Sequence, residues 1–524
     1  MTNPAGSTSA PGGAFFSHKV VSGATWAILN KAVLFLVVLG VQIFTPRVLG
    51  PEKYGVLSLC LTIGETLIIF CGLGLNTALV RFVPELMVDK NRAGIVRMVL
   101  KTGLLQMGAV AGAGVLLFVM RPQFDAWFNV AFGSLLIIAV GFTAARMFKT
   151  LMDDAFTALF QVRTTSALSL IQGLLWFALL LALLPPHPTP HTALWIQIGT
   201  LSSVAIVEAF LLRRYLRGLD WQSPRHGIGK RRTIKIASAS FINAIANVFM
   251  RQYSELFFLG VFFSKSVVGW YALGCVLPLQ LITFLPSGLQ TLFTSGFAEA
   301  YSRDKGCLPK LIATYYKALI VTVLPVSIFG FFAAPRLIGL LFGDPMKEAG
   351  PIASLFFLVH MQGLLSVPLS MAIVVKEKIL NMQPLMLLTI GVNLLLDYLL
   401  IPRYGMYGAV GAVFGTFFLT IPIRLYVVSR LIGGIYFPQA FFARFCLLLT
   451  LLAGAAYPLL PHAGKAGMAA IVVAYAAAYL ALIRAMRLIK PEDVAELRAL
   501  GFVRLNRVID FFVKKAEAGP IAQD

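Results

Sequence analysis

Residues 165–184, TSALSLIQGLLWFALLLALL, contain no charged side chain over twenty consecutive positions. A helix of about 20 apolar residues is long enough to cross the hydrocarbon core of a bilayer. Similar stretches recur along the whole chain, so the sequence predicts an all-α membrane protein with about 14 transmembrane helices. The predicted spans are 20–46, 55–80, 99–120, 128–149, 165–184, 193–212, 236–262, 270–294, 312–334, 351–374, 382–401, 408–428, 441–460 and 467–486.

The composition supports this class of protein. Of the 524 residues, 58% are hydrophobic and only 13% are charged, whereas a soluble domain is about 45–50% apolar and about 25% charged. These values exclude a soluble enzyme, a disordered chain and a secreted disulfide scaffold. The five cysteines have no metal-ligand spacing, so neither a metal site nor a disulfide is expected.

The distribution of positive charge predicts the orientation in the membrane. The formal net charge is +22, which in a soluble chain would suggest nucleic acid. Here the connections on one side of the predicted spans hold 34 Lys and Arg, and those on the other side hold 8. Because cytoplasmic loops of membrane proteins are rich in Lys and Arg, both termini are expected in the cytoplasm and no nucleic acid is expected as a partner.

A basic connection at 213–235 divides the chain into two sets of six spans. Gly55 matches Gly269 and Glu85 matches Glu299 at a constant offset of 214 residues. Six spans per repeat preserve the orientation, so the repeats are expected to be parallel, as in many transporters. The predicted domains are a cytoplasmic N-terminus (1–19), an N-lobe (20–212), the linker (213–235), a C-lobe (236–428), two further spans (441–486) and a cytoplasmic amphipathic tail (487–524).

Charged residues at membrane depth are the candidate functional residues. Each costs roughly 2.5–3.5 kcal/mol at the centre of a lipid-facing helix, so such groups pair with one another or line a wet cavity. Lys31 and Glu65 lie in the first two predicted spans. The seventh span carries a polar stripe at four-residue steps, which one face of a helix would share; its members are Asn243, Asn247, Arg251 and Glu255.

The stripe has two interpretations. In the first, Arg251 lines a cavity, where its planar guanidinium would bind two phosphate oxygens at once. In the second, Arg251 and Glu255 form a pair within the helix that only stabilises packing. Lys31 and Glu65 would pair if their helices are neighbours, or Glu65 would be a protonatable coupling group. Local packing or hydrogen-bonding roles are favoured for Glu208, His360, Asn393 and Asp397.

Several catalytic signatures are absent from the sequence. It contains no G-x-x-x-x-G-K-[ST] phosphate loop, so no ATP hydrolysis is expected. No connection between predicted spans is long enough for a soluble catalytic domain. The sequence therefore predicts a protein that is not an enzyme and needs no cofactor or metal.

Three stretches carry a resemblance to a known family. They are PRVLGPEKYG at 46–55, GLGLNTA at 72–78 with Arg81 after it, and IPRYGMYGAVGA at 401–412. With GATW at 23–26, they resemble the polysaccharide transporter family. These are the Wzx-type oligosaccharide or O-antigen flippases of the MATE-like multidrug/oligosaccharidyl-lipid/polysaccharide (MOP) superfamily. The similarity extends over most of the chain to about residue 430.

The resemblance implies two MATE-like six-helix lobes around a cavity that opens to each side in turn. It implies export of an undecaprenyl-diphosphate-linked oligosaccharide, of the O-antigen, lipopolysaccharide or exopolysaccharide type, across the cell (inner) membrane. Arg251 and Lys31 match the cavity cations that hold the diphosphate, with Asn243 and Asn247 beside them. An ion gradient or the membrane potential would supply the energy, through Glu65 or Glu255. Membrane lipids, a polysaccharide polymerase and chain-length machinery are the implied partners.

Other functions remain open. A drug or cation antiporter of the same superfamily would have an acidic cavity, whereas the deepest charge of span 7 is Arg251. A membrane-embedded glycan transferase or polymerase needs a catalytic outer loop, and the outer loops are short. A scaffold that transports nothing would use the buried charges only as pairs. Relatives that transport lipid II usually carry several arginines in the first spans, where this chain has only Lys31 at depth.

Overall fold

The computed structural model describes residues 13–128, 132–217, 229–249, 253–303, 305–376, 382–435 and 437–485. These residues form α-helices and short 3₁₀ helices with no strand, which confirms the all-α prediction. The α-helices are α1 (Gly13–Gly72), α2 (Leu75–Val88), α3 (Arg92–Val119), α4 (Arg121–Phe128), α5 (Ser134–Ala158), α6 (Val162–Leu183), α7 (Pro190–Arg217), α8 (Lys230–Phe249), α9 (Tyr253–Phe262), α10 (Lys265–Arg303), α11 (Leu308–Phe342), α12 (Ala349–Met361), α13 (Gly363–Val375), α14 (Gln383–Ile432), α15 (Gln439–Ala456) and α16 (Lys465–Ala485).

Within the described residues, eleven helices are long and apolar enough to cross a membrane. The protein is therefore a multi-pass membrane protein. The predicted seventh span corresponds to α8 and α9, and residues 250–252 between them lie outside the described residues. The count of fourteen spans stays a prediction.

Two of the eleven helices, α1 and α14, are each bent at a glycine. Gly50 in α1 has φ 75°, and Gly405 in α14 has φ 58°. Positive φ is readily adopted only by glycine, because a Cβ atom clashes with the backbone there. Gly50 and Gly405 each lie between two predicted spans, in the motifs at 46–55 and 401–412. These motifs therefore encode the sharp change of direction between consecutive spans.

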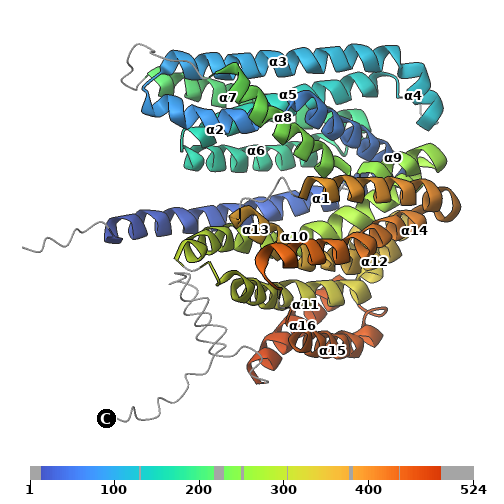
Figure 1. Ribbon diagram of the computed structural model, residues 1–524. Coiled ribbons are helices and arrows are strands. Elements are labelled where there is room, and N and C mark those ends of the chain that lie inside the picture. The colour runs from blue at the N-terminus through green and yellow to red at the C-terminus, as the bar shows by residue number, and fades with distance from the viewer. Residues whose placement is uncertain are drawn as a thin grey trace, which may run out of the picture. The chain divides into compact units, whose positions relative to one another are not determined.

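The chain divides into two compact units. The first comprises residues 1–45, 67–120 and 133–242. Its helices α2, α3, α5 and α7 pack along one another around a shared apolar core (Figure 1). Leu79, Val99, Phe156 and Leu212 each contribute to that core, one from each helix. Large apolar side chains on the outside, such as Leu104, which is 72% exposed, suit a surface that faces lipid.

The second unit comprises residues 46–66, 121–132 and 243–524. Its α11 is the central helix and contacts α10, α12, α13, α15 and α16. The α16 helix, which corresponds to the last predicted span, is hydrogen-bonded to α11 near a proline. Pro325 has no N–H to donate to the carbonyl of Val321 one turn earlier, and the Tyr479 hydroxyl donates to that carbonyl instead. The C-terminal helix α16 thus satisfies a backbone group that Pro325 leaves open in α11.

One predicted boundary was wrong in a way that matters for function. The fourth predicted span, 128–149, ends at Lys149, which was counted among the charges of the cytoplasmic segments and helix ends. In the structure α5 continues to Ala158, and Lys149 is a buried residue of that helix. Lys149, which was counted as a charge of the cytoplasmic side, is therefore buried inside the first unit.

Candidate functional site

A cluster of polar side chains is buried in the second unit. Asn393 of α14 donates from Nδ2 to Glu255 Oε1 of α9 at 3.2 Å. The Ser254 hydroxyl donates to Asn393 Oδ1 at 3.0 Å and lies 3.3 Å from Glu255 Oε2. Glu255 is 1% exposed and Asn393 is 5% exposed. These contacts hold a carboxyl group in a water-poor environment and join α9 to α14.

A second acidic residue belongs to this cluster. Asp397 lies one turn after Asn393 in α14, is fully buried, and interacts electrostatically with Glu255. Neither of its carboxylate oxygens has a hydrogen-bond partner among the described residues. Thr416, from the other half of α14, completes the set with its hydroxyl 3.5 Å from Asn393 Nδ2. We call Ser254, Glu255, Asn393, Asp397 and Thr416 the acidic cluster.

The acidic cluster has the chemistry of a cation or proton site. Two carboxylates cannot both stay charged in a buried site without a neutralising partner, because the desolvation of each charge is expensive. Carboxylate, amide and hydroxyl oxygens are ligands that hard cations prefer. The described residues hold no group of three or more His, Cys, Asp or Glu typical of transition-metal sites. Because its ligand atoms are oxygens of carboxylate, amide and hydroxyl groups, the acidic cluster fits a hard cation or a shared proton.

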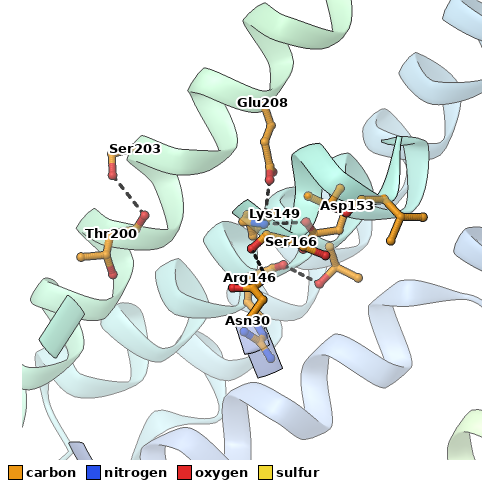
Figure 2. Close-up of polar contacts among 11 residues, drawn as sticks. Asn30, Arg146, Lys149, Asp153, Ser166, Thr200, Ser203 and Glu208 are labelled. Carbon is orange, nitrogen blue, oxygen red and sulfur yellow. Dashed lines mark hydrogen bonds and ion pairs between the residues drawn. The ribbon is translucent and has the colours of Figure 1, made fainter. Parts of the chain in front are cut away.

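The first unit contains a buried ion pair that the sequence did not reveal. Figure 2 shows Lys149 of α5 between Glu208 of α7 and Asp153. Lys149 Nζ donates to Glu208 Oε1 at 2.9 Å and to Asp153 Oδ1 at 2.6 Å. The side chains of Lys149 and Glu208 are 2% and 0% exposed, and that of Asp153 is 34% exposed. Glu208 thus has the local partner predicted for it, and the pair joins α5 to α7.

The structure describes the side chains of only some of the predicted site residues. Arg251 lies outside the described residues, as do the side chains of Asn243 and Asn247, whose backbones belong to α8. Lys31 is exposed in the first unit, and its neighbour Asn30 donates to the Ser166 carbonyl at 2.7 Å. The proposed substrate contacts thus stay predictions.

The two predicted acidic coupling residues are both part of the described structure. Glu65 is partly buried in the second unit. Glu255 accepts a hydrogen bond from Asn393 of α14. Part of its surroundings therefore comes from a helix other than its own. Asn393 and Asp397 were assigned only local roles from the sequence, and their spacing of four residues was the one signal that they share a face with each other.

Two glycines of the predicted repeat meet in the second unit. A Cβ atom on Gly55 would lie 1.9 Å from the Lys265 carbonyl oxygen, and one on Gly269 would lie 2.1 Å from that of Pro51. Lys265 and Gly269 follow Pro51 and Gly55 by the same 214 residues. Each segment therefore contacts its counterpart reciprocally, which is the pattern of two segments related by a two-fold axis. The backbones approach too closely for any side chain, and glycine at both positions makes the contact possible.

Comparison with known sequences identifies a family. The profile of the family described as "Polysaccharide biosynthesis protein" matches residues 45–351. This range includes the motifs at 46–55 and 72–78, and it includes Gly269. No curated protein sequence matches the chain.

Comparison with solved structures identifies the fold. The chain is similar to lipid II flippase MurJ in an inward closed conformation, with 11% identity, a TM-score of 0.66, and coverage of 94% of this chain and 99% of that one. A multidrug resistance MATE family transporter of the MOP superfamily, inward-facing, matches with 12% identity, a TM-score of 0.59, and coverage of 78% and 98%. A MOP superfamily transporter from Pyrococcus furiosus matches with 15% identity, a TM-score of 0.51, and coverage of 78% and 95%. These proteins are transporters rather than enzymes, and the chain has their fold.

Proposed function

Because the chain belongs to the polysaccharide biosynthesis protein family, we propose that it is a flippase for a lipid-linked oligosaccharide. The substrate would be an undecaprenyl-diphosphate-linked repeat unit of the O-antigen or exopolysaccharide type. The protein would lie in the cell membrane with both termini in the cytoplasm. The exported repeat unit would then reach the polymerase and chain-length machinery on the outer side.

The observation that carries this proposal is the fraction of this chain that each structurally similar protein matches. The lipid II flippase covers 94% of the chain, whereas the MATE transporter covers 78%. A twelve-span core explains the second match, and a flippase with additional helices explains the first. The contact between Tyr479 of α16 and α11 supports this view, because it makes the C-terminal helices an integral part of the second unit.

Substrate binding is assigned to the polar stripe of the seventh predicted span and to Lys31. Arg251 and Lys31 would neutralise the diphosphate, and Asn243 and Asn247 would donate hydrogen bonds to the sugar. Arginine suits this role because its fork engages two phosphate oxygens. The charged headgroup crosses the membrane only if such groups replace its water, since an unpaired charge in hydrocarbon is prohibitively costly.

Energy coupling is assigned to the acidic cluster rather than to Glu255 alone. A cation or proton entering the cluster would offset the negative charge shared by Glu255 and Asp397 and draw α9 and α14 together. Its release would leave two buried negative charges and favour a conformation in which they separate or become hydrated. The seventh span carries both Glu255 and the substrate-binding stripe. A movement of this span on cation binding would therefore also move the residues assigned to the substrate. Glu65 is a second candidate for coupling.

Alternation between the two open states would use the reciprocal glycine contact. With the predicted orientation, Gly55 and Gly269 lie at the outer ends of their helices. Their contact would close the path to the outside, and its separation would open it. Backbones in such close contact are held by many weak contacts without side-chain interlocking, so the two segments can part along the contact.

The first experiment is deletion of the gene, followed by analysis of surface polysaccharide and lipid-linked intermediates. The proposal expects loss of polymer with repeat units accumulating on the cytoplasmic face of the membrane. Unchanged polymer with raised sensitivity to cationic drugs would identify a drug antiporter instead. Accumulation on the outer face would place the protein at polymerisation, after transport.

The substrate-site assignment is tested by Arg251→Ala. We expect loss of surface polymer with normal membrane insertion, because the diphosphate loses its bidentate partner. Lys465→Ala, in a predicted outer connection, is the matched control and should export normally. Normal polymer from the Arg251→Ala strain would contradict this assignment.

The coupling assignment is tested by Glu255→Gln in reconstituted vesicles. The variant keeps the shape and the Asn393 neighbour but removes the charge. We expect flipping to lose its dependence on the ion gradient, and comparison of sodium and pH gradients identifies the coupling ion. A variant whose flipping still follows the gradient would refute the role of the acidic cluster.

A further inference from the structure

A partly buried arginine in the second unit has no acidic partner among the described residues. Arg424 lies in the last part of α14, at the end predicted to be cytoplasmic. Its Nη2 donates to the Ser370 hydroxyl of α13 at 3.3 Å. Its Nε is buried and has no hydrogen-bond partner within the described part of the chain. The ion pairs formed by the described residues do not include Arg424.

The guanidinium lines a small cavity between α13 and the two halves of α14. The free space in this cavity is about 20 Å³, and Ser366, Thr389 and Thr420 are its other polar lining residues. The Ser366 hydroxyl is buried and has no partner among the described residues. The hydroxyls of Thr389 and Thr420 already donate to backbone carbonyls one turn earlier. Among the described residues that line the cavity, the buried donors left open are therefore Arg424 Nε–H and the Ser366 O–H.

These observations call for a negative charge in the cavity. A buried guanidinium that lacks a counter-charge is destabilising, and a water molecule would supply a hydrogen bond without neutralising it. A water molecule needs about 10–15 Å³ of such space, so the cavity holds one particle of about that size. A phosphate group with its ester chain does not fit.

We propose that the cavity between Arg424 and Ser366 binds one small monovalent anion of chloride's size. The anion would accept from Arg424 Nε–H and from the Ser366 hydroxyl, while Ser370 holds the other side of the guanidinium. Its role would be to neutralise Arg424 and to join α13 to both halves of α14. This site uses none of the residues assigned to the substrate site or to the acidic cluster, and it does not depend on either assignment.

The test is thermal unfolding of the purified full-length protein in detergent. Chloride is replaced by gluconate at constant sodium and constant ionic strength, so that the acidic cluster sees no change. We expect chloride and bromide to raise Tm by roughly 1–3 °C in a saturable manner, because a ligand that binds only the folded state stabilises it. Crystals grown in bromide should show an anomalous peak between Arg424 Nε and the Ser366 hydroxyl.

Variants assign the effect to the cavity. Arg424→Gln should remove the chloride dependence, and Ser366→Ala should weaken the apparent affinity roughly tenfold without removing the guanidinium. Ser366→Ala keeps the test decisive if Arg424→Gln does not fold. Arg336→Gln is the matched control, because Arg336 Nε already donates to the Ala463 carbonyl at 3.0 Å. This control should keep the full chloride dependence.

Two results would overturn the proposal. The first is that the Tm of the wild-type protein does not respond to chloride, whereas the Tm of the Glu377→Gln variant rises with chloride. That outcome would mean that the carboxylate of Glu377, which lies outside the described residues, pairs with Arg424. The second is a bromide peak elsewhere, with ordered water alone in the cavity.

Discussion

Replacement of Lys149 by methionine should destabilise the first unit strongly, and a second substitution should restore it. Methionine has a similar length and no charge, so it leaves the Glu208 carboxylate buried without its partner. The Glu208 side chain is 0% exposed, so its carboxylate does not contact bulk water in the folded unit. The second variant, Lys149→Met with Glu208→Leu, removes both charges from the same site.

The magnitude follows from the geometry. At the 2.9 Å separation of Lys149 Nζ and Glu208 Oε1, the attraction is about 6 kcal/mol for an effective dielectric constant of about 20. Desolvation of two ions offsets most of this attraction, so the pair as a whole contributes little to stability. Removal of one partner is different, since it typically costs about 3–5 kcal/mol. The single substitution should lower the free energy of unfolding by that amount, and the double substitution by less than about 1 kcal/mol.

The assay is a double-mutant cycle measured by unfolding of the purified protein, with Glu208→Leu as the other single variant. The expected coupling energy is at least about 2 kcal/mol, because Lys149→Met leaves the Glu208 carboxylate buried without its partner, whereas the double variant removes that carboxylate too. Asp153→Asn is the control, as Asp153 is 34% exposed and water can replace it. Additive effects of the two single substitutions would refute the claim that Lys149 and Glu208 stabilise the unit as a pair.

Two further predictions concern the second unit. Gly269→Ala should abolish or slow transport, because its Cβ would lie 2.1 Å from the Pro51 carbonyl oxygen; Gly108→Ala, which meets nothing within 4 Å, should transport normally in the same export assay. Asn393→Ala should lower the free energy of unfolding by roughly 1–3 kcal/mol, because it leaves Glu255 with one hydrogen-bond neighbour fewer in a buried site; an unchanged unfolding curve would show that this amide contributes nothing to the acidic cluster.

Local sequence patterns predicted much of the fold. The helical membrane architecture follows from apolar runs, because a segment in hydrocarbon must satisfy its own backbone and a helix does so. The bends at Gly50 and Gly405 were not predicted, although both glycines lie in motifs that carry the family resemblance, between predicted spans. The end of the fourth predicted span at residue 149 was misread because a Lys in an apolar segment looks like the end of a span unless its partner is known.

What the sequence by itself determined is the all-helical membrane class, the family, and the rarity of charges at membrane depth. Only the tertiary structure decided which of those charges meet. Glu255 and Asn393 are 138 residues apart, and Lys149 and Glu208 are 59 residues apart. Neither pairing follows from helical spacing, because periodicity relates residues on one helix and says nothing about which face of another helix lies opposite. A buried charge is stabilised by whatever side chains packing brings within about 3 Å, so its function is specified by the fold and not by its neighbours in the chain.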